Sequence, residues 1–225
     1  MLRAMLSNYR AAIAVVVVVV LAIAGYWGYA EQQKRAQRDA VTAAIKDTTA
    51  RLRDSLAVAP NVTGKRSLAR IEEHTVAVEG HLKLARGAAA RIPELADGAE
   101  HYFIGAQAIL HRQAASIRQS EQSAASRAVL VSHMRRAQRR DAAWIRDAMT
   151  HKKTVESQYF DYSLTLETLA DLLHGFRDSR TRVEAYVDDS ALLEVGRAED
   201  ARRLVVKESQ RVADELDGVR RLALR

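Results

Sequence analysis

The residues of this chain most suited to chemistry are its histidines and the acidic residues near them. Asp171 and His174 are three residues apart, with Glu167 one turn earlier, and a carboxylate three residues before a His on a helix can hold a metal ion. His74 and His81 are seven residues apart and so share a helix face, a spacing that a metal or haem site could use. Each pair supplies few ligands, and a solvated helix edge and a helix interface explain them as well. We therefore expect no metal and no cofactor.

Sequence motifs of enzymes are missing. The chain has no Gly-rich phosphate loop, no Gly-x-Ser-x-Gly, no His-Glu-x-x-His, and no Cys for thiol chemistry or disulfides. Tyr159 and Tyr162 could line a small-molecule pocket between helices, although aromatic residues at this spacing more often form a core. The sequence predicts a protein that is not an enzyme and has no catalytic residues.

The elements that carry these residues are predicted to be long helices. Two Pro and ten Gly in 225 residues leave too few turns for a β-sandwich or barrel. From Leu68 to Ile117, steps of alternately three and four residues meet apolar side chains almost without exception, which is the seam of packed helices. Shorter seams of the same period run over 41–55, 155–176 and 205–223. We expect an all-α fold whose body, residues 31–225, is an elongated antiparallel helical bundle or coiled coil.

Only a few positions in the sequence indicate a break between the long helices. A loop is expected near 59–66, around Pro60 and Gly64, and turns near 119–126 and 175–180. The seam does not slip at Pro93, which favours a kink there, although a helix that restarts with Pro as its first residue stays open. The predicted helices cover 12–58, 67–118, 124–175 and 181–225. Real turns at Pro93 and one later site would give five or six shorter helices.

Residues 11–30 form an apolar segment of twenty residues without a charge, long enough to cross a membrane as a helix. A tail of ten residues precedes it. Residues suited to the membrane interface flank the segment on both sides: Tyr9, Arg10, Tyr26, Trp27 and Tyr29. A cleaved signal peptide is the competing interpretation, but the length of the run and the bulky aromatic residues at its end favour a signal-anchor helix that stays.

The numbers of cations on the two sides of this anchor are nearly equal, so they do not decide its orientation. Arg3 and Arg10 precede the segment, and Lys34, Arg35 and Arg38 follow it. A short tail before a large body favours the tail in the cytoplasm. We expect a single-pass protein of the inner (plasma) membrane with an extracytoplasmic, periplasmic body.

Charge is uneven along the body. Residues 127–153 contain eight Lys and Arg against two Asp, and residues 154–200 contain four Arg against eleven acidic residues. The two stretches could pair within the bundle, or the basic one could dock on anionic lipid or an acidic partner. We expect no nucleic acid, because no reader module is recognisable. The candidate basic docking face comprises Arg135, Arg136, Arg139, Arg140, Arg146, Lys152 and Lys153.

These observations predict a membrane-anchored helical scaffold or adaptor that binds or spaces partner proteins at the cell envelope. Its partners would be the membrane, other membrane or envelope proteins, and a further copy of the chain in a homo-oligomer. One alternative is an extracytoplasmic helical-bundle module that senses or binds a ligand. The other is a membrane-tethered coiled-coil scaffold that faces the cytoplasm.

Overall fold

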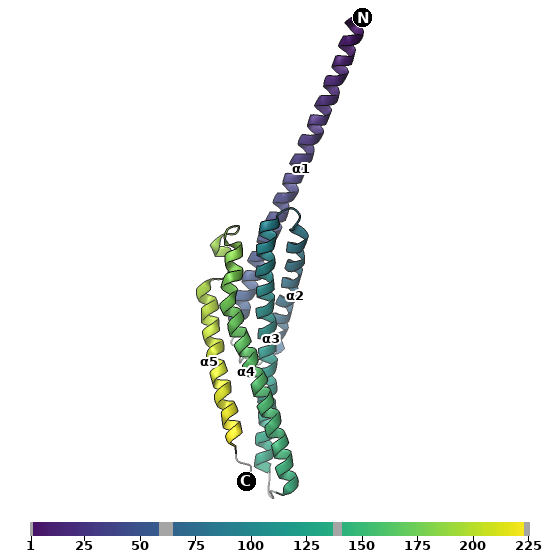
Figure 1. Ribbon diagram of the computed structural model, residues 1–225. Coiled ribbons are helices and arrows are strands. Elements are labelled where there is room, and N and C mark those ends of the chain that lie inside the picture. Colours follow the sequence, from purple (N-terminus) through teal and green to yellow (C-terminus); the bar gives the residue numbers. More distant parts are fainter. Residues whose placement is uncertain (1, 59–64, 137–140, 223–225) are drawn as a thin grey trace.

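The computed structural model describes residues 2–58, 65–136 and 141–222, with side chains from residue 19 onward except at 22 and 136 (Figure 1). These residues form helices and short connections, with no strand among them. The predicted all-α helical bundle is therefore confirmed. Its elements are α1 (Leu2–Leu56), α2 (Lys65–Ala88), α3 (Pro93–Arg136), α4 (Ala142–Glu184), the 3₁₀ helix η1 (Asp189–Ala191) and α5 (Val195–Arg221).

The helices alternate in direction along one long axis (Figure 1). The first part of α1 projects from one end of the bundle, and its second part packs against α2 and α3. The 44 residues of α3 rise over ~66 Å, whereas the 24 residues of α2 rise over only ~36 Å. As a result, α1 and α2 flank one half of α3, and the other half is accompanied by α4 and α5 alone (Figure 1).

The core follows the predicted seams closely. All five positions of the seam over 41–55 are buried, and so are all seven positions of the seam over 155–176. In the long seam, Leu68 is half-buried and Ala89 is exposed, while the other thirteen positions are buried. The last position of the seam over 205–223 lies outside the described residues. Apolar spacing thus identified the buried face of every bundle helix.

Pro93 begins a new helix, so the kink favoured by the sequence is wrong and the restart is correct. The backbone N–H of Ile92 bonds to the carbonyl of Ala88 at 3.0 Å, which closes the end of α2. Pro93 then occupies the first position of α3, where its missing N–H has no helical partner to lose. The apolar period continues across the break because the antiparallel helices α2 and α3 each turn their own apolar face toward the core.

The predicted turn near 119–126 is wrong, because α3 is continuous through it. The polar residues that favoured a turn are accommodated inside the helix. Ser123 donates its hydroxyl to the carbonyl of Gln119 at 2.5 Å, and Ser116 does the same to Gln113 at 2.8 Å. Buried serines that bond back to the preceding turn need no break in the helix.

The predicted turn near 175–180 is also wrong, since α4 runs to Glu184. Arg180 lies within hydrogen-bond reach of Glu184 one turn later and also of Asp189, so the charged residues extend the helix instead of ending it. The chain reverses instead around η1, where the sequence shows two consecutive Asp residues. The predicted loop near 59–66 falls between α1 and α2, and residues 59–64 lie outside the described residues.

Within the described residues, no helix is long and apolar enough to cross a membrane. The predicted span at 11–30 lies partly outside them, because side chains 11–18 and 22 are not described. Tyr26, Trp27 and Tyr29 are exposed on the projecting part of α1. Tyr9 and Arg10 belong to the same helix, and their side chains lie outside the description. The span stays a prediction.

Candidate functional site

A groove opens between α3 and α5 at the point where α1 ends. Leu56 and Val58, at the end of α1, border Gln113 of α3 and Val205 of α5. The side-chain amide of Gln113 donates to the carbonyl of Ser55 at 2.5 Å, which fixes this end of α1 against α3. Beyond it, α3 and α5 both pack against α4 (Figure 1). Residues of α3 and α5 line the groove there, and none of its lining residues belongs to α1.

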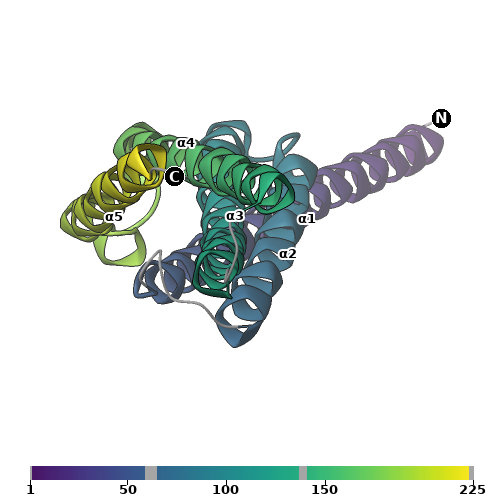
Figure 2. The same ribbon diagram turned by 90° about the horizontal axis from the view of Figure 1, so that it is seen from below.

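The walls of the groove continue the faces that hold α1. On α3, the hydroxyl of Tyr102 contacts Thr49 of α1 at 2.7 Å, and Gln113 contacts Ser55. The same alternation of three and four residues leads along α3 to Ser116, Ser120, Ser123, Arg127, Leu130 and Met134. On α5, it leads from Val205 to Glu208, Arg211 or Val212, Glu215, Val219 and Leu222. Viewed along the bundle from below, the last turns of α1 lie beside α3 on the side of α5, whereas the projecting part of α1 lies on the opposite side (Figure 2). One half of the bundle therefore has α1 in a position that is open in the other half.

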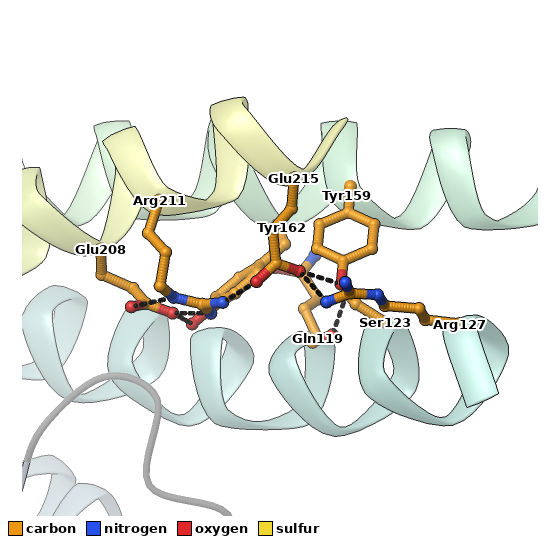
Figure 3. A network of polar contacts seen from close by, with 8 residues as sticks. All are labelled: Gln119, Ser123, Arg127, Tyr159, Tyr162, Glu208, Arg211 and Glu215. Atoms are coloured by element: carbon orange, nitrogen blue, oxygen red, sulfur yellow. Dashed lines mark hydrogen bonds and ion pairs between the residues drawn. The ribbon is translucent and has the colours of Figure 1, made fainter. Parts of the chain in front are cut away.

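The half of the groove nearest to α1 is polar and is centred on Glu215 (Figure 3). The Glu215 carboxylate accepts from the Tyr159 hydroxyl at 2.5 Å and from Arg127 at 2.7 Å, and it also pairs with Arg211. These three partners come from α4, α3 and α5, so one carboxylate joins all three helices. This part of the groove encloses about 400 Å³, and Ser120 and Ser123 lie on its α3 side.

A second carboxylate continues the network. Glu208 is buried, accepts from the Tyr162 hydroxyl at 3.1 Å and pairs with Arg211 at 2.6 Å. Burial and the neighbouring Glu215 raise the pKa of Tyr159 to about 12. Burial likewise raises the pKa of Tyr162, and Glu208 adds to the effect. Both tyrosines therefore remain neutral hydrogen-bond donors at physiological pH, which suits structure and not proton transfer.

The half of the groove farther from α1 is apolar. It encloses about 630 Å³ between α3 and α5, and no atom lies within 4 Å of a Cβ built on Gly218. Leu130 and Val219 are buried in its floor, while Val131 and Leu222 are each 38% exposed. A solvent-exposed apolar trough of this size is a feature of binding surfaces rather than of finished cores.

His74 and His81 have a structural position that sequence spacing alone did not reveal. The Nδ1 of His74 lies 3.0 Å from the hydroxyl of Ser55, and its Nε2 lies 3.6 Å from Asp54. Seven residues on, the Nδ1 of His81 lies 2.8 Å from the hydroxyl of Thr48 on α1, and its Nε2 lies 3.4 Å from the carboxylate that precedes Thr48. The same set of three groups thus recurs one heptad apart at the interface of α1 and α2.

These sets resemble a Ser–His–Asp triad in composition, but their geometry is structural. Ser55 is buried in the middle of a helix interface, where a substrate cannot reach its hydroxyl. Both ring nitrogens of each His face α1, so neither is directed at a metal or haem. Burial lowers the pKa of His74 and His81 below the usual 6.5, more than the neighbouring Asp carboxylates raise it. The two rings are neutral clamps between α1 and α2.

Glu167, Asp171 and His174, the other candidate ligands, are exposed on α4. Among the described residues, no group of three or more His, Asp or Glu side chains is arranged so that it could hold a metal ion. Their arrangement matches a solvated helix edge.

The candidate basic docking face is divided by the structure. Arg135 lines the apolar half of the groove, and Lys152 donates to the carbonyls of Arg220 and Leu222 at 2.8 and 3.1 Å, which caps the end of α5. Arg146 and Lys153 are exposed on α4. Arg136 is the last residue of α3, and its side chain is not described. Arg139 and Arg140 lie outside the described residues.

Pairing of the basic stretch with the acidic one, which the sequence left open beside docking, is limited within the described residues. Lys152 lies 3.9 Å from Glu156, whereas Arg127 pairs with Glu215, outside the acidic stretch. The basic stretch is thus directed in part at α5. Sequence reasoning had no means of finding this, because Glu215 is one of many acidic residues at unremarkable spacing.

A second cluster that the sequence did not indicate lies where α3 and α4 meet. The ring of His133 stacks on Trp144 with centroids 5.3 Å apart, and His151 meets His133 edge-on at the same distance. The contact of His133 Nε2 with the Trp144 carbonyl at 3.2 Å makes that nitrogen a donor. The cluster joins α3 to α4 near their connection.

No family model matches the chain, and no curated protein and no solved structure shows significant similarity to it.

Proposed function

We propose that the protein is a membrane-anchored helical adaptor, without enzymatic activity, that holds partner proteins at the cell envelope through the groove between α3 and α5. The observation that carries the proposal is that α1 joins the apolar segment at 11–30 to the interior of the bundle in one helix. An anchor and a binding surface are thus parts of one body.

The bundle part of α1 is firmly built into the core. Val41, Ile45 and Leu52 are fully buried. Arg53 of the same helix donates to the carbonyl of Leu192 at 3.1 Å and lies 3.6 Å from Glu194, close to the start of α5. Because α1 is packed in this way, any position of the anchor in the membrane fixes the direction in which the groove faces.

Membrane anchoring is tested by extraction of membranes with alkaline carbonate. We expect the full chain to remain in the membrane pellet, and Val20→Asp with Ile23→Asp to move it to the supernatant, because each acidic residue in a span costs about 3 kcal/mol. Val76→Asp with Leu84→Asp is the matched control, since both positions are exposed on α2. Release of the unchanged chain by carbonate contradicts the proposal.

A ligand-binding module is a second candidate, favoured by the volume of the apolar half of the groove. About 630 Å³ lies within the range of small-molecule sites. A small apolar compound that raises the melting temperature of the purified chain, and fails to do so when Leu130 is replaced by Asp, would support this candidate over an adaptor.

A further inference from the structure

We propose that the groove between α3 and α5 receives one amphipathic helix of a partner protein, which takes the place that α1 occupies in the other half of the bundle. This inference rests on the proposed adaptor function and names the class of partner. The occupant has an apolar face and flanks of opposite charge.

Continuity with the α1 interface argues for a helix as the occupant. The faces of α3 and α5 that enclose the end of α1 run on past Gln113 and Val205 without a change of register. Three helices that present a continuous seam leave the position of a fourth helix in a bundle open. From Ser120 to Met134 the groove extends over fourteen residue steps, or ~21 Å, so the occupant is a helix of about four turns.

Gly218 allows this helix to come close. It is exposed on α5 within the apolar half of the groove, and a Cβ there meets nothing within 4 Å. A residue without a side chain costs helix stability, by about 1 kcal/mol relative to Ala. Its place on a groove wall gives an approaching helix close access to the backbone of α5.

The charges of the groove walls define the flanks of the occupant. Arg127 and Arg211 are neutralised by Glu215 and Glu208. On the wall formed by α3, Arg135 has no ion-pair partner among the described residues, and on the wall formed by α5 the same is true of Asp214. The occupant therefore carries an acidic flank toward α3 and a basic flank toward α5, as in pairing of coiled-coil helices by their flanking charges.

The test uses the full chain in detergent and a stapled, fluorescent peptide of fourteen residues. The peptide has Leu at heptad spacing, Glu on one flank and Lys on the other. We expect it to bind the unchanged chain and to bind Gly218→Leu at least tenfold more weakly, since the new side chain extends into the groove from a position where a Cβ meets nothing within 4 Å. Gly175→Leu is the matched control, because a Cβ at Gly175 also meets nothing within 4 Å, and Gly175 lies on α4 outside the groove. The control should bind within twofold of the unchanged chain.

A charge reversal tests the flanks. Arg135→Glu makes both walls acidic, so a peptide with Lys on both flanks should then bind better than the mixed peptide, and the reverse should hold for the unchanged chain. Equal binding of the mixed peptide to Gly218→Leu and the unchanged chain, or no binding to either, overturns the inference. A dimer of the unchanged chain that Gly218→Leu dissociates in sedimentation assigns the groove to a second copy and also overturns it. Carbonate extraction of the same variants is independent of the groove, so failure of the anchor and failure of the groove are told apart.

Discussion

Replacing Glu215 should remove contacts to three helices at once. Its carboxylate holds Tyr159 of α4, Arg127 of α3 and Arg211 of α5, and its side chain is only 21% exposed. Charge-assisted hydrogen bonds in such a partly buried place are stronger than surface ion pairs. The network therefore stabilises the open half of the bundle, where no fourth helix contributes.

Glu215→Gln should destabilise the protein by about 1–2 kcal/mol, because the amide still accepts a hydrogen bond but no longer offsets two guanidinium charges. Unfolding in urea, followed by circular dichroism, measures the difference. Asp214→Asn is the matched control. Asp214 is exposed next to Glu215, so its change should stay within about 0.5 kcal/mol. Equal effects of the two substitutions would show that the network is not stabilising.

The clamps formed by His74 and His81 make stability depend on pH. Because burial lowers their pKa in the folded state, the unfolded chain binds more protons, and stability falls as the pH drops below the usual value of 6.5. The loss levels off once the pH lies below the folded-state pKa. The charged groups that act on the two rings are Asp47, Arg51, Asp54, Arg70 and Glu73.

We expect the melting temperature of the unchanged chain to fall between pH 7 and pH 5, and the fall to be smaller in a variant with His74→Gln and His81→Gln. His111→Gln is the control for a His replacement as such, since His111 is exposed on α3 and lies outside the interface of α1 and α2. A double variant with the same pH dependence as the unchanged chain would refute the clamps.

At the scale of residues, the sequence indicated which side chains share a helix face but not which residues they contact. The spacing of His74 and His81 correctly placed them on one face. Their hydroxyl and carboxylate partners are on α1, and no pattern within α2 specifies them. For Tyr159 and Tyr162, burial confirms the core interpretation, and both also line the polar half of the groove, where a small-molecule pocket stays a prediction.

At the scale of elements, the close approach of α3 and α4 depends on a glycine. A Cβ on Gly98 would lie 2.6 Å from the carbonyl oxygen of Arg182 and 3.2 Å from Val183. The partner atom nearest to it is backbone and cannot move aside easily. The contact therefore sets how closely the first turns of α3 can lie against the last turns of α4.

Gly98→Ala should destabilise the protein by about 1–3 kcal/mol through overpacking, despite the better helix propensity of Ala. Gly80→Ala, in the interior of α2 with nothing within 4 Å of its Cβ, should instead stabilise by about 0.5–1 kcal/mol. Thermal unfolding of the two variants measures both effects. Stabilisation by Gly98→Ala would mean that the two helices are not in contact there.

The helix boundaries were harder to predict than the helices. Apolar period alone cannot distinguish a kink at Pro93 from a reversal, since both preserve the phase of the seam. At 119–126, a polar composition predicted a turn, but serines there donate to carbonyls of the same helix. At 175–180, the predicted turn is absent because Arg180 pairs with Glu184 of α4 and with Asp189 after it. In each case, local side-chain bonds outweighed a turn-like composition.

At the scale of the whole molecule, the groove results from unequal helix lengths. Because α2 and the bundle part of α1 are much shorter than α3, they complete the bundle over only part of its length. Sequence seams specify which face of a helix is buried but not against how many neighbours, so the open half could not be foreseen. The apolar half of the groove leaves apolar side chains exposed to water unless a partner covers it.

The measurement that tests the account most directly is the topology of the chain in intact cells. The chain has no Cys, so a single Cys at Ser157, exposed on α4, or at Ser7 in the tail reports one side of the membrane each. We propose that the bundle lies outside the cytoplasm, so a membrane-impermeant maleimide should label Ser157→Cys before lysis and Ser7→Cys only after it. Labelling of Ser157→Cys only after lysis would contradict an anchored body that presents its groove to the cell envelope.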